Sequence, residues 1–100
     1  YRYVQIAFAE ELRMICDGLG IDFEEVKESC NTKWNIEILD AKGGIGGHCL
    51  PKDVAYCLSL AKDANSLLKG AIETDEKYRE RIKSWERRVA VRALSDSPYE

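Results

Sequence analysis

The sequence predicts an all-α domain, and three observations lead to this fold class. The 100 residues match the size of one domain. Apolar residues recur at helical intervals of three and four in two long stretches, at residues 1–18 and from about 66 to 94. Between them, residues 32–50 lack a helical period and include four glycines in five positions. We therefore expect a single domain with a wide-faced N-terminal helix, a glycine-rich loop and a long C-terminal helix.

The first predicted helix runs from Tyr1 to about Gly18. One apolar stripe follows its length, and four further apolar residues lie off that stripe. The stripe consists of Tyr1, Val4, Phe8, Leu12, Ile15 and Leu19, and the residues beside it are Ile6, Ala7, Ala9 and Met14. Such a wide apolar arc needs cover on more than one side. Gly18 and Gly20 are expected to end the helix, because glycine adopts the left-handed turn that closes helices.

A second, shorter helix is predicted from Asp22 to about Cys30 or Asn31. Asp22 and Glu25 have the spacing of a capping box, in which two side chains bond the opposite ends of the first turn. In the following stretch, Ile36 and Ile38 alternate with polar residues, so a short extended segment is possible there.

Two more helices complete the predicted fold. Pro51 suits the first position of a helix, where its missing N–H would lack a partner anyway. Asn65 or Ser66 is a suitable cap for the last helix, which is expected to reach about Leu94. Asp75 interrupts its apolar stripe of Leu68, Ile72, Tyr78, Ile82, Trp85 and Val89. Its other face is expected to be solvated and carries Lys77, Arg79, Glu80, Arg81, Lys83, Glu86, Arg87 and Arg88.

Composition excludes several classes of function. A net charge of -3 and a pI near 5.2 argue against nucleic acid, whose phosphates require a basic face. No apolar run approaches the ~20 residues of a membrane span, and no secretion leader is visible. We therefore expect a cytoplasmic protein that binds no membrane. The chain begins at Tyr1 without Met, which suggests an excised fragment of a longer protein.

The cysteines favour neither zinc nor disulfides. No CxxC pair occurs, and the single histidine, His48, directly adjoins Cys49, so one metal ion could hardly be chelated by both. Disulfides are not expected in a protein that is not secreted. Three cysteines lie in apolar helical surroundings and are expected to be small core residues: Cys16, Cys30 and Cys57.

The run from Gly43 to Asp53, GGIGGHCLPKD, is the most informative segment. Its glycine spacing does not fit a dinucleotide-binding G-x-G-x-x-G turn, and no GK[ST] follows as in a P-loop. Cys49 lies just before the predicted helix start, where the helix dipole and the nearby cation of Lys52 would stabilise a thiolate. Asp53 is close enough in sequence to accept a proton or to orient a water molecule.

Local chemistry alone leaves an alternative, a structural glycine loop with a buried cysteine at a helix cap. His48 is favoured as a loop or substrate contact rather than a general base. The reason is that neighbouring side chains of an extended segment point in opposite directions.

The same run resembles the active-site cysteine motif of the UDP-glucose/GDP-mannose dehydrogenase family. Residues 1–12, YRYVQIAFAEEL, resemble the helix that precedes the motif in that family. The dipeptides 31–32 and 38–39 also fall where family members have similar residues, so the resemblance covers about residues 1–75. The Gly-His-Cys version of the motif is most similar to the branch that oxidises UDP-N-acetylhexosamines.

The resemblance implies a central domain that forms a homodimer through residues 1–19. It also implies oxidation of the C6 alcohol of a UDP-sugar to a carboxylate, with two NAD bound in turn by a missing N-terminal domain. Cys49 matches the nucleophile that holds the aldehyde as a thiohemiacetal and then as a thioester. Asp53 matches the acidic residue that assists proton or water handling. The expected substrate contacts are Gly43, Gly44, Gly46, Gly47, His48, Lys52 and Lys33.

Two departures from the family limit this transfer. The family's catalytic lysine and asparagine precede Tyr1 and are absent from this chain. Where members place an arginine that reaches the partner subunit's substrate, Asn35 stands here, with Lys33 nearby. Three readings remain: a catalytic fragment that is inactive alone, a helical dimerisation module with a structural glycine loop, and an unrelated thiol-redox domain.

Overall fold

Four helices make up the fold. The structure is a computed structural model that describes the backbone of residues 1–46 and 49–95 and the side chains of residues 1–46 and 50–87. In chain order the helices are α1 (Arg2–Leu19), α2 (Phe23–Cys30), α3 (Cys49–Leu60) and α4 (Ser66–Ser95). No strand occurs within the described backbone, so the predicted all-α class is confirmed.

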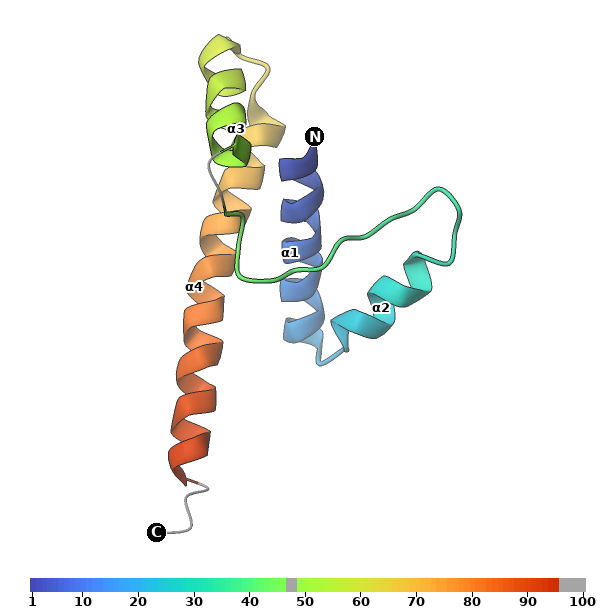
Figure 1. Ribbon diagram of the computed structural model, residues 1–100, viewed down its shortest axis with the longest axis vertical. Helices are drawn as coiled ribbons and strands as arrows, with labels where there is room; N and C mark the ends of the chain where they lie inside the picture. Colours follow the sequence, from blue (N-terminus) through green and yellow to red (C-terminus); the bar gives the residue numbers. More distant parts are fainter. Residues whose placement is uncertain (47–48, 96–100) are drawn as a thin grey trace.

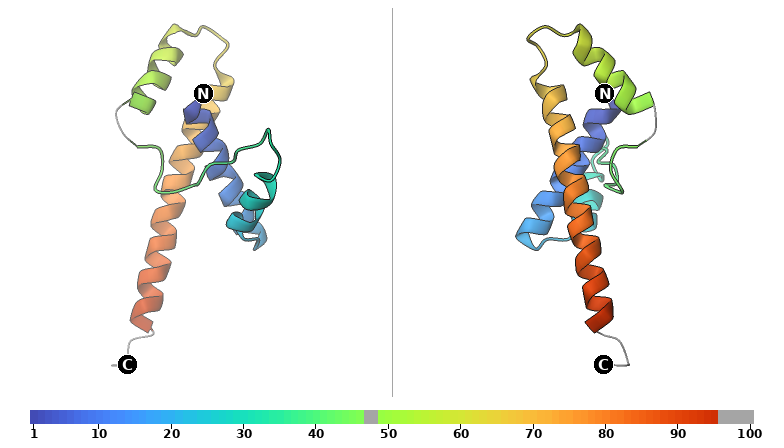
Figure 2. Two further views of the ribbon diagram at one scale, coloured as in Figure 1. Left: turned by 45° about the vertical axis from the view of Figure 1, so that its right-hand side comes forward. Right: turned by 90° about the vertical axis from the view of Figure 1, so that its left-hand side faces the viewer.

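The two long helices, α1 and α4, lie side by side and form the body of the domain (Figure 1). α3 lies against the N-terminal part of α4, and α2 leaves the end of α1 at an oblique angle. The connection from α2 turns back, crosses α1 and then reaches α3. The C-terminal part of α4 extends beyond the other helices (Figure 2). This arrangement brings the loop before α3 against both α1 and α4.

The ends of the first two helices follow local chemistry. Gly20 closes α1 in the left-handed conformation, with φ of 70°, whereas Gly18 lies inside the helix and does not end it. The side chain of Asp22 caps α2 by accepting a hydrogen bond of 3.2 Å from the backbone N–H of Glu24. The capping box predicts a bond between Asp22 and Glu25, but in the structure Asp22 binds the N–H of Glu24 instead.

Many large apolar side chains of α1 are exposed, whereas its buried face includes several small residues. Most of the apolar stripe predicted for this helix is exposed, at Tyr1, Phe8, Ile15 and Leu19. The buried face instead consists of Tyr3, Ala7, Ala9, Glu10 and Cys16. Three of these five buried residues are small, and several large apolar side chains are left without cover in the single chain.

Two hydrophobic clusters form the core, and each includes a residue of the loop before α3. Ile45 is 2% exposed in the cluster where α1, α3 and α4 meet. Ala41 belongs to the second cluster, beside the fully buried Tyr78 of α4. The second half of this loop is therefore part of the core.

The stretch around Ile36 and Ile38, where a short extended segment is possible, forms no strand within the described backbone. The side chain of Asn31 binds both backbone groups of Ile38, at 2.6 and 3.0 Å. The prediction that three cysteines are core residues is corrected. Cys57 is exposed on α3, whereas Cys16 is buried and Cys30 half-buried.

Among the helices described here, none has both the length and the apolarity needed to cross a bilayer.

Candidate active site

α3 begins at Cys49, two residues earlier than the predicted start at Pro51. Pro51 is tolerated at the third position because the first N–H groups of a helix have no intrahelical acceptor. Cys49 therefore occupies the N-terminal position of α3, where the helix dipole favours a negative charge. Gly47 and His48 lie outside the described residues, as does the side chain of Cys49.

Lys52 and Asp53 are exposed on the first two turns of α3. Asp53 follows Cys49 by four residues, so the two positions share one face of the helix. The structure thus brings Cys49, Lys52 and Asp53 to one helix end, as the sequence predicts. Their roles in a reaction stay predictions.

The loop that leads to α3 is first fixed at residues 41–42. Arg13 of α1 donates hydrogen bonds to the carbonyl of Ala41 (2.7 Å) and to the hydroxyl of Tyr78 (2.9 Å). Tyr78 in turn donates to the carbonyl of Lys42. Burial raises the pKa of the Tyr78 hydroxyl, which favours this neutral donor form. A third side chain, Trp85, lies with its ring centroid 4.8 Å from the Arg13 guanidinium.

A second anchor holds Ile45 by both of its backbone polar groups. Its N–H donates to the Asp75 carboxylate at 2.9 Å, and its carbonyl accepts from the guanidinium of Arg79. Arg79 also donates through Nε to the second oxygen of Asp75, at 2.8 Å. Asp75 and Arg79 are one helical turn apart on α4, so a single face of that helix supplies the anchor.

Gly44 is the position in this loop that requires glycine. Its φ is +102°, a conformation that other residues rarely adopt. A Cβ atom built there would lie 2.9 Å from Nε of Arg79. Gly43 and Gly46 are more open, with no other atom within 4 Å of an added Cβ. The Arg79 anchor and the bare backbone of Gly44 therefore depend on each other.

Behind this anchor lies Glu10 of α1, with none of its surface exposed. Burial, and then the neighbouring Asp75 carboxylate, raise the pKa of Glu10 to about 8, against the opposing effect of Arg79. Glu10 is thus a neutral carboxylic acid at neutral pH. Within the described part of the chain, neither carboxylate oxygen of Glu10 has a hydrogen-bond partner.

Sequence reasoning missed these anchoring residues. The sequence pattern makes Asp75 an interruption of an apolar stripe and Arg79 part of a solvated face. In the structure, both side chains form hydrogen bonds with the loop. An acidic residue inside an apolar stripe, followed four positions later by arginine, was the available signal.

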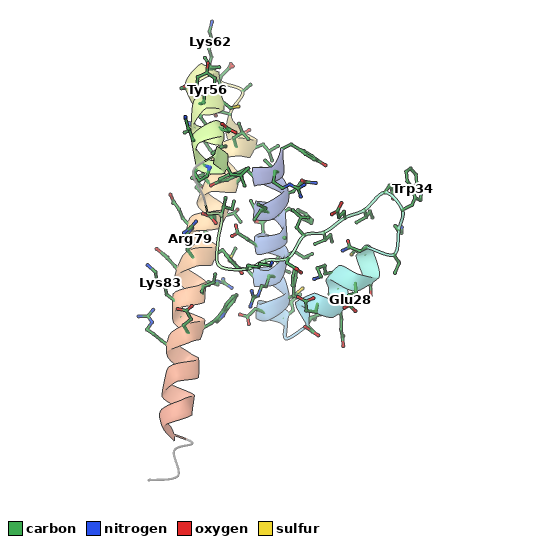
Figure 3. All side chains as sticks on the ribbon, in the orientation of Figure 1. Glu28, Trp34, Tyr56, Lys62, Arg79 and Lys83 are labelled. Atoms are coloured by element: carbon green, nitrogen blue, oxygen red, sulfur yellow. The ribbon has the colours of Figure 1, made fainter. Side chains whose placement is uncertain are left out.

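Lys33 is not brought to the other predicted site residues within one chain. It lies in the turn after α2, next to Trp34, whose side chain is 96% exposed. Figure 3 places Trp34 at the tip of the connection, on the far side of α1 from α3. Within one chain, the turn that contains Lys33 and the start of α3 thus lie on opposite sides of α1.

The described residues do not fit a dinucleotide site. Such a site needs a glycine turn between a strand and a helix, and α3 is preceded by an irregular loop in an all-helical chain. The described residues therefore contain no dinucleotide-binding unit of this kind. In residues 1–46 and 50–87, no three His, Cys, Asp or Glu side chains come together as a metal site.

Comparisons with known proteins fit this geometry. Residues 1–77 match the model of the UDP-glucose/GDP-mannose dehydrogenase family, central domain. An NDP-N-acetyl-D-galactosaminuronic acid dehydrogenase from Ralstonia nicotianae is 36% identical over 76 residues, which is 76% of this chain and 18% of that protein. A UDP-N-acetyl-D-mannosamine dehydrogenase from Pyrococcus horikoshii is 36% identical over 77 residues, again 18% of its length.

A solved structure extends the likeness to the fold. The UDP-D-ManNAc dehydrogenase of Pyrococcus horikoshii superimposes with a TM-score of 0.80 at 31% identity. The match covers 93% of this chain and 22% of that one. The chain thus spans about a fifth of the length of the proteins it matches.

Proposed function

Since this chain belongs to the UDP-glucose/GDP-mannose dehydrogenase family, we propose that it is the central domain of an NAD-dependent nucleotide-sugar 6-dehydrogenase. Residues 1–100 would form one catalytic and dimerising unit of a longer enzyme. The NAD-binding and UDP-binding domains would lie outside the chain, because it spans only 18% of its curated relatives. The chain alone is therefore proposed to be inactive.

One observation carries the proposal: Cys49 begins a helix directly after a loop that two other helices hold in place. A helix N-terminus lowers the pKa of a thiol by favouring the thiolate, which is the reactive form. Lys52 adds a cation in the same turn. A structural cysteine would not need this electropositive setting.

The proposed chemistry oxidises the sugar C6 alcohol to an aldehyde and then to a carboxylate. The Cys49 thiolate adds to the aldehyde carbon, and the aldehyde oxygen takes up a proton to give a thiohemiacetal. Oxidation at the same carbon then leaves a thioester. For both oxidations, NAD held by residues outside this chain would be the two-electron acceptor. Water then adds to the thioester carbon and the sulfur leaves as the thiolate. Asp53, on the same helical face, is proposed to assist proton transfer to or from that water.

The proposed substrate class is the UDP-N-acetylhexosamines. Several relatives are named UDP-N-acetyl-D-mannosamine dehydrogenases, including those of Pyrococcus horikoshii and Campylobacter jejuni. Contacts with the sugar are proposed for the backbone of Gly43, Gly44 and Gly46 and for Lys52. Gly47 and His48 remain predicted contacts outside the described residues.

The exposed apolar face of α1 supports a second role, homodimerisation. Phe8, Ile15 and Leu19 are each about half exposed or more in the single chain. A second copy of α1 would cover them, and the dimer would allow Lys33 to approach the partner subunit's substrate. A helical dimerisation module is therefore the alternative function, and the family's central domain would combine both roles.

Light scattering tests this dimer at high micromolar concentration. The parent chain is expected to have the mass of a dimer, and Ile15→Asp that of a monomer, because a buried unpaired charge is strongly unfavourable. Tyr56→Asp is a matched control on α3, where Tyr56 is also exposed, and it should stay dimeric. A monomeric parent would contradict the proposed interface.

The catalytic proposal is tested in the intact enzyme that contains this domain. Cys49→Ser is expected to abolish carboxylate formation, with a loss of about 1000-fold or more, because serine is a far poorer nucleophile at neutral pH. Cys57→Ser, an exposed cysteine on the same helix, should keep the parental rate. Full carboxylate production by Cys49→Ser would refute the role of the cysteine.

A further inference from the structure

Ile45 lies four residues before Cys49, and both of its backbone groups are held by side chains of α4. We propose that Asp75 and Arg79 are positioning residues for Cys49. This inference rests on the catalytic role of Cys49 proposed above, but the anchoring itself can be measured without catalysis.

The anchor depends on the shape of the arginine side chain. Nε of Arg79 donates to Asp75, and a second nitrogen of the same guanidinium donates to the carbonyl of Ile45. The planar group thus links the carboxylate and the peptide in one fixed arrangement. Lysine has a single ammonium nitrogen on a flexible stem and cannot reproduce two separate, fixed donors.

The two carboxylate oxygens of Asp75 accept hydrogen bonds from two different donors. One oxygen accepts from the N–H of Ile45 and the other from Arg79. The Asp75 side chain is only 9% exposed, so water gives little competition for these bonds. Together, Asp75 and Arg79 fix where the peptide of Ile45 lies and how it is rotated.

Glu10 lies next to Asp75, on the side of the anchor that faces α1. A buried ionised glutamate beside Asp75 would place two negative charges together, which is unfavourable at low dielectric. The protonated acid avoids this repulsion. Tyr3 of the same helix also faces this group, and its hydroxyl pKa is raised mainly by burial and by Asp75. The cluster therefore joins α1, α4 and the loop.

The position of Ile45 bears directly on the start of α3. Its side chain belongs to the same core cluster as Val54 of α3, while its backbone is held by α4. A loop displaced at Ile45 would shift the first turn of α3 relative to that core. Displacements of about 1 Å can slow an enzymatic step about 100-fold, because the reacting atoms no longer align.

The first test measures the anchor in the 100-residue chain. Amide hydrogen exchange at Ile45 is expected to accelerate about tenfold or more in Asp75→Leu, which removes the acceptor. Asp75→Asn keeps an acceptor oxygen and should give a smaller increase. Lys83→Gln, an exposed charge one turn beyond Arg79, is the matched control and should leave the exchange unchanged (Figure 3). Unchanged exchange at Ile45 in a folded Asp75→Leu would overturn the anchor.

The second test measures positioning in the intact enzyme. Arg79→Lys, which retains the charge and is expected to fold, should lower kcat about tenfold while KM for the nucleotide sugar changes less than about twofold. A variant that merely unfolds in part would lower the active fraction, and active-site titration of Cys49 with iodoacetamide corrects for this loss. A parental kcat in Arg79→Lys would overturn the positioning role.

The two proposals fail in different ways. If Cys49 is not the nucleophile, Cys49→Ser retains activity whatever happens at Ile45. If Asp75 and Arg79 do not position the loop, Cys49→Ser is inactive while Arg79→Lys keeps the parental kcat. Support for both requires an inactive Cys49→Ser, a reduced kcat in Arg79→Lys and faster Ile45 exchange in Asp75→Leu.

Discussion

The two halves of the connection between α2 and α3 are held in different ways. In the first half, residues 31–38, Trp34 is 96% exposed, and the main side-chain anchor is local, from Asn31 to Ile38. In the second half, residues 41–45, Ala41 and Ile45 are 8% and 2% exposed. Four side chains of α1 and α4 hold their backbone or that of Lys42: Arg13, Asp75, Tyr78 and Arg79.

This contrast indicates that the two halves of the loop have different structural roles. The second half takes its position from two long helices that pack on each other, so it can hold the start of α3 in a fixed place. The first half is held by Asn31 and by the packing of Ile38 on the second core cluster, and it leaves the large side chain of Trp34 in solvent. Exposed aromatic residues are enriched where proteins meet other molecules. We therefore expect substitutions in the second half to cost much more stability than those in the first.

The largest effect is expected for Gly44→Ala. Alanine would be strained at φ of +102°, and its Cβ would press on Arg79. We expect the free energy of unfolding in denaturant to fall by about 3 kcal/mol. Gly43→Ala, where the added Cβ meets nothing within 4 Å, should change it by less than about 1 kcal/mol. Equal losses at the two glycines would contradict the contrast.

The next effect concerns the pH dependence of stability. The pKa of Glu10 rises from its ordinary 4.5 in the unfolded chain to about 8 in the fold. The stabilisation of this neutral acid is therefore complete below about pH 4.5 and is lost as the pH rises toward 8. The groups facing it are Asp75 and Arg79 from α4 and Tyr3 from its own helix.

Glu10→Gln removes the titration but keeps a hydrogen-bond donor. Between pH 5 and pH 8, we expect the parent to lose about 2 kcal/mol or more of unfolding free energy relative to this variant, measured by urea denaturation. Glu11→Gln is the control, because Glu11 is exposed. A constant difference between parent and Glu10→Gln across this range would show that Glu10 is ionised in the fold.

A smaller effect is expected for Asn31→Ala in the first half. The variant loses two hydrogen bonds to the backbone of Ile38, but this region is exposed and water can replace them. The expected loss is about 1 kcal/mol of unfolding free energy. Asn35→Ala, in the same exposed turn, should have no measurable effect. A loss from Asn31→Ala as large as that from Gly44→Ala would remove the distinction between the halves.

Trp34→Ala is expected to have the smallest effect on the fold. With 96% of its surface exposed, the side chain has little packing to lose, so stability should change by less than about 0.5 kcal/mol at concentrations that keep the chain monomeric. A loss above about 1 kcal/mol under those conditions would show that Trp34 packs within its own chain.

Local patterns in the sequence predicted the helices well. The cap at Asp22, the left-handed Gly20 and the break before Ser66 each depend on nearby residues, and the structure confirms them. The predicted start of α3 was wrong because it relied on the preference of proline for the first helical position. In the structure the two residues before Pro51 also belong to the helix. The long motif around Cys49 indicated the family, which the comparisons confirm.

Long-range contacts could not be predicted in the same way. Ile45 and Asp75 are 30 residues apart, and nothing local indicates that an acidic residue on α4 binds that peptide. Periodicity likewise assigned the large apolar residues of α1 to one stripe but could not show that Phe8 and Ile15 stay exposed in the single chain. Which face of a helix is buried depends on its partners, and a sequence pattern alone does not specify them.

The central claim is that Cys49 forms a covalent bond with the substrate, and trapping that bond tests it most directly. The intact enzyme would be mixed with UDP-N-acetylmannosamine and NAD, quenched in acid within one turnover, digested and analysed by mass spectrometry. We expect the sugar adduct on the peptide that contains Cys49 and not on those that contain Cys16, Cys30 or Cys57. Carboxylate product formed at the parental rate with the Cys49 peptide never modified, or with the adduct on another cysteine, would contradict the account.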